Sequence, residues 1–275
     1  MVPAPYRGVA TAPRADLRSR AMVRLVFSPP EAHAAMGESA ELHRLVTGDA
    51  LDQAMYASSL LTMVLRQARA AGAERVVVEV QGAGEVHDHM AAANGLHLDR
   101  EILRLRRDLP TGLDWTLDVL PFRVNDDAEA WLEVNNRAFA WHPDQSDFTL
   151  ERLLAKEAEP WFDPAGFLVH EVDGRMAGFC WTRIHADERP PLGEVFVIGV
   201  DPDFQGQGLG GPLVLAGLDW LAAQGLRNGI LYTESSNVAA RTLYRRLGFE
   251  DNAVNRWWSR DLDGADATSE AAARP

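Results

Sequence analysis

The stretch Gln205-Gly206-Gln207-Gly208-Leu209-Gly210 decides the fold of this chain. It follows residues 193–200, whose nearly unbroken apolar character is typical of a central β-strand. It leads directly into residues 209–224, which are predicted to form a helix. Glycines permit positive backbone dihedrals and a close approach to a ligand, and the N–H groups at a helix N-terminus attract anions. The stretch therefore predicts a strand, an anion-binding loop and a helix. It is not a P-loop, because no Gly-Lys-Ser/Thr follows.

The sequence around this loop predicts a mixed α/β unit. The turn Asp173-Gly174 joins two apolar segments and indicates a hairpin over residues 166–185. Because the loop comes late in a mainly antiparallel series, a dinucleotide-binding fold is disfavoured. The other expected elements are a strand over 115–120, helices over 126–140 and 149–158, a strand over 230–233 and a helix over 238–247.

An internal repeat appears when the chain is shifted on itself by 153 residues, which aligns 72–109 with 225–262 without a gap. Each segment is predicted to form a strand, a helix, a glycine-containing turn and a second strand. The same shift aligns a predicted helix over 56–71 with the one over 209–224. Residues 52–57 take the place of the glycine loop in the first copy and contain no glycine. We therefore expect an α/β fold with a mixed sheet and two repeats, the second intact and the first truncated and degenerate.

Composition excludes several classes of protein. The 275 residues are 47% hydrophobic and carry a net charge of −13, which favours a globular chain and disfavours binding to nucleic acid. No apolar stretch reaches the roughly 20 residues of a membrane span, and the N-terminus lacks the features of a signal peptide. A single cysteine, Cys180, forms no internal disulfide, which indicates a reducing cytoplasm.

Two sequence motifs carry a resemblance to a known family. The glycine loop, followed by Asn237-Val-Ala-Ala and by Leu243-Tyr-Arg-Arg-Leu-Gly-Phe249, resembles the GNAT N-acetyltransferases. Within that superfamily, the chain is similar to the mycothiol synthases, which are tandem-repeat enzymes of actinobacteria. This similarity rests on Leu192-Gly-Glu-Val-Phe-Val-Ile-Gly-Val-Asp-Pro202, Leu231-Tyr-Thr-Glu-Ser-Ser-Asn-Val-Ala-Ala240, His142-Pro-Asp-Gln and Glu159-Pro-Trp-Phe-Asp-Pro164.

The resemblance implies an enzyme that transfers acetyl from acetyl-CoA to the cysteinyl amine of cysteinyl-glucosaminyl-inositol, giving mycothiol. It implies Glu194 as the base, acting through water, and Tyr244 as the acid that protonates the coenzyme thiolate. These roles match a chemical need, because a free α-amine has a pKa of about 7.7–8.0 and must lose a proton before it attacks a thioester. The residue aligned with Tyr244 in the first copy is Ala91, which cannot supply this acid.

The resemblance also implies two sets of binding residues. For the acceptor these are Asp144, Arg183, Glu194 and Tyr232, of which Asp144 and Arg183 stand where the family usually has Glu and Lys. Gln207 stands where family loops often carry arginine. For the coenzyme they are Ile198, Gly199, Val200, Gln205, Gly206, Gln207, Gly208, Leu209, Gly210, Gly211, Asn237, Val238, Ala239, Ala240, Arg241 and Thr242.

Two other hypotheses remain open: the chain is a GNAT enzyme for a different small amine, or it is a non-catalytic acyl-CoA-binding protein. Cys180 lies between Phe179 and Trp181 and is expected in the core, and the pair His87 and His89 lacks further ligands for a metal, so no metal is expected. We expect a monomer without nucleic-acid or membrane partners. The expected domains are an irregular segment 1–36, a degenerate repeat 37–110 that binds no coenzyme, a catalytic domain 113–262 and a disordered tail 263–275.

Overall fold

The computed structural model describes residues 22–27, 50–70, 74–142 and 145–262. The tail 263–275 lies outside the described residues, as does the segment 1–36 apart from 22–27. The chain divides into two compact units: residues 1–103 with 253–275 form unit 1, and residues 104–252 form unit 2. In the described residues we find no helix with the length and apolar character that a membrane crossing needs.

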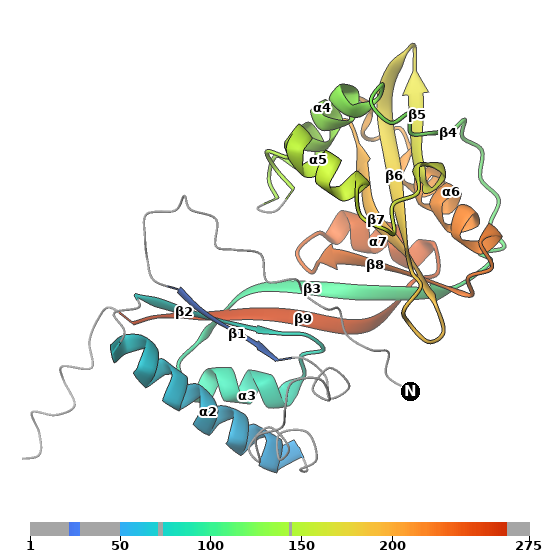
Figure 1. Cartoon of the computed structure of the whole chain (residues 1–275). Coiled ribbons are helices and arrows are strands. Elements are labelled where there is room, and N and C mark those ends of the chain that lie inside the picture. Colours follow the sequence, from blue (N-terminus) through green and yellow to red (C-terminus); the bar gives the residue numbers. More distant parts are fainter. Residues whose placement is uncertain (1–21, 28–49, 71–73, 143–144, 263–275) are drawn as a thin grey trace, which may run out of the picture. The chain divides into compact units, whose positions relative to one another are not determined.

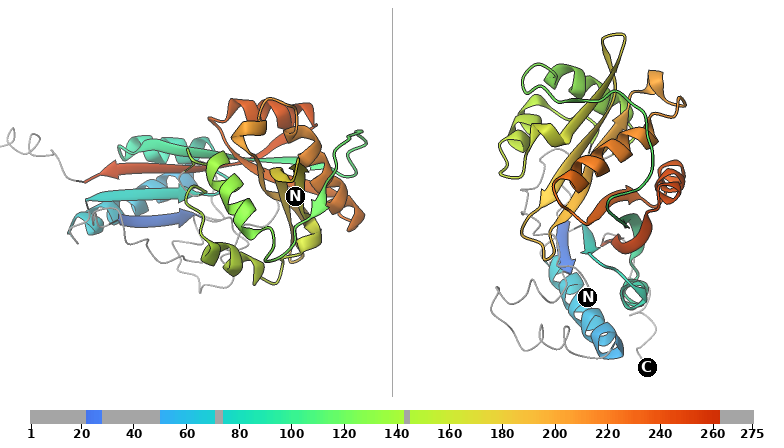
Figure 2. Two further views of the ribbon diagram at one scale, coloured as in Figure 1. Left: turned by 90° about the horizontal axis from the view of Figure 1, so that it is seen from above. Right: turned by 90° about the vertical axis from the view of Figure 1, so that its right-hand side faces the viewer.

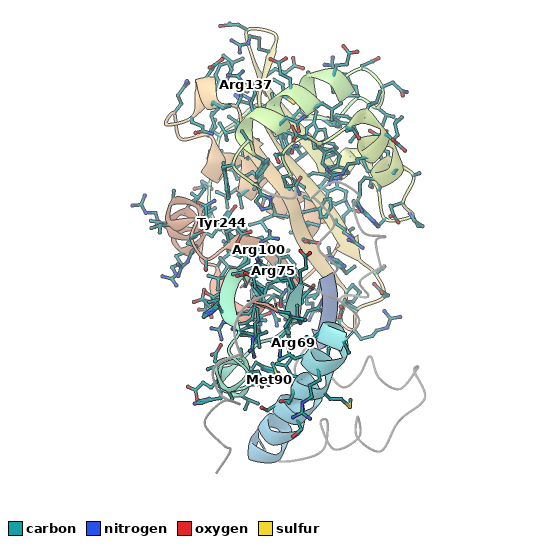
Figure 3. The ribbon with its side chains drawn as sticks, turned by 90° about the vertical axis from the view of Figure 1, so that its left-hand side faces the viewer. Arg69, Arg75, Met90, Arg100, Arg137 and Tyr244 are labelled. Carbon is teal, nitrogen blue, oxygen red and sulfur yellow. The ribbon has the colours of Figure 1, made fainter. Side chains whose placement is uncertain are left out.

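Unit 1 is a small sheet covered by two helices (Figure 1). Strand β2 (Arg75–Val80) lies between β1 (Met22–Phe27), which is parallel to it, and β9 (Glu250–Asp261), which is antiparallel. Helices α2 (Ala50–Ala70) and α3 (Glu85–Ala93) bury their apolar sides on this sheet. Met90 of α3, labelled in Figure 3, is fully buried in that core.

Unit 2 holds the strands predicted around the glycine loop, in the order β8-β7-β6-β5-β4. The hairpin β5 (Phe167–Val172) and β6 (Arg175–His185) is confirmed, and its turn residues Asp173 and Gly174 have φ of 52° and 74°. Strand β7 (Leu192–Val200) is antiparallel to β6 and parallel to β8 (Asn228–Glu234). The predicted central strand is therefore confirmed.

Helices cover both faces of this sheet (Figure 2). On one face lie α4 (Ala128–Ala138) and α5 (Leu150–Glu157), and on the other lies α6 (Gly210–Ala223). Trp131 of α4 is completely buried among the rings of Phe148, Phe167, Phe179 and Trp181. Two short 3₁₀ segments, η2 (Pro164–Gly166) and η3 (Pro202–Phe204), precede β5 and the glycine loop, and α7 (Val238–Arg246) follows β8.

The repeat predicted at an offset of 153 residues is present in the structure. Adding 153 to the bounds of α3 and of β3 (His97–Asp108) gives the bounds of α7 and β9, and α2 and α6 end at equivalent residues. The last strand of each repeat, β3 in the first and β9 in the second, lies partly in the other unit. Residues 104–108 of β3 belong to unit 2, beside β8, and β9 from Ala253 onward belongs to unit 1, beside β2.

Two equivalent arginines fix the exchanged strands. Arg107 of β3 donates hydrogen bonds to the carbonyl oxygens of Leu247, at the end of α7, and of Thr111. Its counterpart Arg260 of β9 donates to the carbonyl oxygen of Asn94, at the end of α3, at 2.8 Å. A cation at a helix C-terminus satisfies free carbonyl groups and interacts favourably with the helix dipole. Each repeat therefore caps the helix of the other.

One predicted element is wrong. Residues 115–120 do not form a strand: β4 contains only Leu120 and Pro121. The alternation of residue types does produce alternating burial, because Trp115, Leu117 and Val119 are half-buried. The segment is held instead by side chains, since Trp115 Nε1 donates to Asp219 at 2.6 Å and the Asp118 carbonyl oxygen lies 2.6 Å from a ring nitrogen of His170.

We expect the substitutions Arg107→Met and Arg260→Met each to lower the free energy of unfolding by about 1–2 kcal/mol, because each leaves helix-end carbonyl groups without their charged donor. Urea unfolding would measure the change. The control is Arg245→Met, which removes an exposed pair with Asp251 at 3.2 Å and should cost less than about 0.5 kcal/mol. Equal losses in Arg107→Met and Arg245→Met would contradict the capping role.

Cys180 should be inert in the native chain. Complete burial raises the pKa of its thiol to about 12, so the thiol stays protonated at pH 8. We expect no reaction with a thiol-specific chromogenic disulfide under native conditions and one reactive thiol per chain in guanidinium chloride. Rapid labelling of the native chain would show that the core around β6 opens readily.

Candidate active site

The site is organised by the separation of two parallel strands. β7 and β8 are paired at Gly193 with Gly229, Glu194 with Ile230 and Val195 with Leu231. Within the described chain no further β7–β8 pair follows, although β7 runs on to Val200. The second half of β7 therefore presents an edge toward β8 that no strand fills.

A β-bulge in β7 lies at the point of separation. Trp181 of β6 is opposite Val197 and the next residue, Thr182, is opposite Val195, so Phe196 is the extra residue. A bulge bends its strand and increases the local twist, which turns the second half of β7 away from β8.

A pocket of about 450 Å³ lies beside this open edge; we call it the edge pocket. The separated end of β7 forms one wall, and the segment just before α7 forms the other. Trp141, which is 57% exposed, stands at its margin. It is lined by Ala138, Phe139, Trp141, Ile198, Gly199, Val200, Gln205, Ser236 and Asn237.

A second pocket, of about 360 Å³, lies over the glycine loop; we call it the loop pocket. It shares Val200 and Gln205 with the edge pocket, so the two adjoin. Its lining includes six of the predicted loop residues, all except Gln207, together with Leu243 of α7. The full set is Val200, Phe204, Gln205, Gly206, Gly208, Leu209, Gly210, Gly211 and Leu243.

Backbone conformation explains the glycines of this loop. Gly206 and Gly208 have φ of 78° and 83°, in the left-handed region that side chains disfavour. Helix α6 starts directly after them with no side-chain cap, so its first N–H groups are available to a ligand. A Cβ on Gly210 would lie 3.3 Å from Leu243, which shows that α7 packs closely over the start of α6.

The loop has no free cation of its own among the described residues that border it. Gln207 stands where the resemblance to the GNAT family led us to expect an arginine. Its side-chain nitrogen Nε2 lies 3.5 Å from the carbonyl oxygen of Asp203. Arg137 and Arg175 both hydrogen-bond the carboxylate of Asp203, and these bonds lower its pKa. Arg137, labelled in Figure 3, also pairs with buried Asp201 at 2.8 Å. Any anion at the loop is therefore held mainly by backbone N–H groups.

The other predicted coenzyme segment forms the start of α7. Asn237 lines the edge pocket and also caps the helix, since its side chain accepts a hydrogen bond from the N–H of Ala240 at 3.1 Å. Val238 and Ala239 belong to the first turn, Arg241 donates to the carbonyl oxygen of Ser235 and Thr242 donates to that of Val238. Of this segment, only Asn237 lines either pocket.

Glu194 lies on β7 just before the bulge and is only 3% exposed. Arg183 of β6 is directly opposite it in the antiparallel register, so both side chains project from the same face. The Arg183 guanidinium stands 4.7 Å over the ring of Trp161. Glu194 Oε2 lies 2.7 Å from Nε2 of His185, two residues further along β6.

Tyr232 of β8 also comes close to this group. Burial raises the pKa of its hydroxyl to about 12, and the negative charge of Glu194 adds to the rise. Arg104 opposes the rise through its charge and a hydrogen bond. Tyr232 is therefore a neutral hydrogen-bond donor near pH 7. The structure thus brings three of the predicted acceptor residues together: Glu194, Arg183 and Tyr232.

Tyr244 is 7% exposed on the inner side of α7 (Figure 3). Its ring meets Phe249 edge to face, with centroids 5.9 Å apart. Burial raises the pKa of its hydroxyl, and the nearby Cys180 thiol raises it further. Tyr244 is therefore protonated at neutral pH, as an acid must be before it donates.

The structure adds residues to which the sequence analysis assigned no role. His185 contacts Glu194, Arg104 contacts Tyr232, and Trp161 stacks on Arg183. His185 could have been found from the two-residue period of a strand, which places it on the same face as Arg183. Arg104 comes from β3 of the first repeat, and no sequence pattern predicts that this strand lies beside β8 of the second repeat. Asp144 lies outside the described residues.

No set of three metal-ligating side chains is gathered anywhere in the described residues. His87, one of two histidines that the sequence places close together, instead accepts a hydrogen bond from the N–H of Gly84 at 3.1 Å. Burial lowers the pKa of His87, so this ring is neutral at pH 7 and serves the start of α3.

Comparison with known proteins agrees with this geometry. Residues 128–249 match the Acetyltransferase (GNAT) family. Among solved structures, a GCN5-related N-acetyltransferase from Sphaerobacter thermophilus is similar with a TM-score of 0.59 and 21% identity, covering 74% of this chain and 68% of that one. A tandem GNAT protein from the clavulanic acid pathway is similar with a TM-score of 0.52 and 16% identity, covering 80% and 72%. At these identities the structures show the fold alone.

Curated relatives are closer in sequence. The chain is 52% identical over 162 residues to the mycothiol acetyltransferase of Acidimicrobium ferrooxidans, covering 56% of this chain and 52% of that protein. It is 45% identical over 193 residues to that of Streptomyces griseus, covering 68% and 62%. The chain therefore spans between half and two thirds of these relatives. Residues 128–249 are a GNAT acetyltransferase domain, and the chain that carries them is a relative of the mycothiol acetyltransferases.

Proposed function

We propose that this protein is an acetyl-CoA-dependent N-acetyltransferase that acetylates the cysteinyl amine of cysteinyl-glucosaminyl-inositol to give mycothiol. The observation that carries the proposal is the unfilled edge of β7, which leads from Glu194 to the glycine loop past two adjoining pockets. The names of the relatives at 45–52% identity support the acceptor.

The open edge suits an extended ligand that carries amide groups. Unpaired backbone N–H and C=O groups need hydrogen-bond partners, and the pantetheine arm of coenzyme A offers amides that can take the place of a strand. We assign Ile198, Gly199 and Val200 to that arm, and the loop from Gln205 to Gly211 to the diphosphate. This placement puts the thioester near the bulge, within reach of the face that carries Glu194.

The chemistry then needs one base and one acid. Glu194 accepts a proton from the amine through water, the amine nitrogen attacks the thioester carbonyl, and the carbon–sulfur bond breaks. A backbone N–H of β7 in the edge pocket stabilises the developing oxyanion. Tyr244 donates its proton to the departing thiolate. Tyr232 and Arg183 hold polar groups of the acceptor beside Glu194.

Coenzyme A release tests this function directly. The full chain would be mixed with acetyl-CoA and the cysteinyl pseudodisaccharide, and free thiol would be followed with the product checked by mass spectrometry. A panel of other small amines serves as the comparison. An acceptor outside this class that is preferred by orders of magnitude would refute the assigned substrate, and binding of acetyl-CoA without turnover of any amine would refute catalysis.

Glu194→Gln should lower kcat by about 10²–10⁴-fold while the KM for acetyl-CoA changes little, because the amide keeps the shape and loses the base. Steady-state kinetics would measure both constants. The matched control is Glu171→Gln, which removes a part-buried carboxylate paired with Arg123 at 2.9 Å, away from both pockets. Unchanged turnover in Glu194→Gln would mean that another group is the base.

Gly208→Ala should raise the KM for acetyl-CoA by about ten-fold or more. A Cβ at this position meets no atom within 4 Å, so the damage comes from the backbone, which leaves its left-handed conformation and misaligns the loop N–H groups. Gly174→Ala is a close control, because Gly174 has φ of 74° and equally open space but lies in the β5–β6 turn. If both variants bound acetyl-CoA as the wild type does, the loop would not hold the diphosphate.

A further inference from the structure

The contact between His185 and Glu194 joins two side chains that are almost fully buried. His185 is 9% exposed, Glu194 is 3% exposed, and Nε2 lies 2.7 Å from Oε2. A carboxylate removed from water is costly unless hydrogen-bond donors compensate it. His185 supplies such a donor in either charge state, since Nε2–H can donate from the neutral ring as well as from the cation.

The strands that carry the pair leave it little freedom to rearrange. β6 and β7 are paired without interruption from Thr182 and Val195 to His185 and Leu192, on the acceptor side of the bulge. Glu194 is fixed there on one side by β6 and on the other by β8, through its pairing with Ile230. Nearby Arg183, opposite Glu194, holds its guanidinium over Trp161. The ring of His185 therefore approaches Glu194 from a rigid element.

We propose that His185 is a positioning residue for the base of the reaction: by binding Oε2 of Glu194 it fixes the orientation of the carboxylate that receives the amine proton. This inference rests on the proposed function. The proton balance is unchanged by it, because the amine proton passes to Glu194, the amide bond forms, the carbon–sulfur bond breaks and Tyr244 protonates the thiolate. His185 keeps its own proton on Nε2 throughout.

The matched control is a second histidine of unit 2. His170 of β5 is also 9% exposed and uses one ring nitrogen, Nδ1, in a contact of 2.6 Å with the carbonyl oxygen of Asp118. It lies outside both pockets and away from Glu194. His170→Leu therefore reproduces the loss of a buried, hydrogen-bonded ring without touching the base.

The experiment compares kinetics of the full chain in five variants: His185→Leu, His185→Gln, His170→Leu, Glu194→Gln and the double variant His185→Leu/Glu194→Gln. We expect His185→Leu to lower kcat by about 10- to 100-fold, a part of what a general base contributes, with the KM for acetyl-CoA unchanged. His185→Gln, which keeps an N–H near the same place, should recover most of this loss. His170→Leu should leave kcat within about two-fold.

The double variant separates positioning from mere stability. If His185 acts through Glu194, its removal has no further effect on kcat once Glu194 is an amide, whereas two independent defects would multiply. Thermal unfolding and calorimetric binding of acetyl-CoA would check that each variant is folded. Multiplying effects, or a His185→Leu chain as active as His170→Leu, would overturn the inference. A wild-type chain that releases no coenzyme A with any amine would instead refute the proposed function.

Discussion

The separation of β7 from β8 after Val195 is the constraint on which the rest of the site depends. Two parallel strands that stayed paired to the end would satisfy each other's backbone groups and leave no opening. Here the extra residue Phe196 bends β7, and residues 198–200 border a pocket instead of pairing with β8. Backbone N–H and C=O groups along this edge that do not pair with a strand need other hydrogen-bond partners.

Packing on both sides keeps this opening from collapsing. Below the bulge, the aromatic cluster around Trp131 fills the space between α4 and the sheet, so β6 and β7 cannot shift toward that helix. On the other face, the sheet approaches α6 so closely that a Cβ on Gly217 would lie 2.5 Å from the sulfur of Cys180. Gly199 is a glycine for a similar reason, because the ring of Phe179 lies 2.8 Å from where its Cβ would be. Close packing against Phe179 is therefore enough to require a glycine at position 199.

Local pattern predicted most of unit 2, and the failures have a common physical cause. The hairpin at Asp173-Gly174, the helix after the glycine loop and the repeat at 153 residues follow from turn chemistry and periodicity, which act over short distances. Residues 115–120 have the alternation of a strand but find no partner, because their hydrogen bonds go to side chains on other elements. His185 and Arg104 were missed because their roles depend on which strands become neighbours, and one sequence does not state that.

The exchange of strands places part of the first repeat in the unit that carries the glycine loop. Residues 104–108 of β3 belong to the unit that carries the glycine loop, and Arg104 hydrogen-bonds both Tyr232 and Asn252. The hydrogen bond from Arg104 restrains the Tyr232 side chain, whose hydroxyl pKa is raised in part by the charge of Glu194. The first repeat has no glycines at the positions of the loop and has Ala91 at the position of Tyr244. Its last strand nevertheless supplies Arg104, which hydrogen-bonds Tyr232. The absence of glycines from residues 52–57 therefore does not remove the structural place of the strand that ends the same repeat.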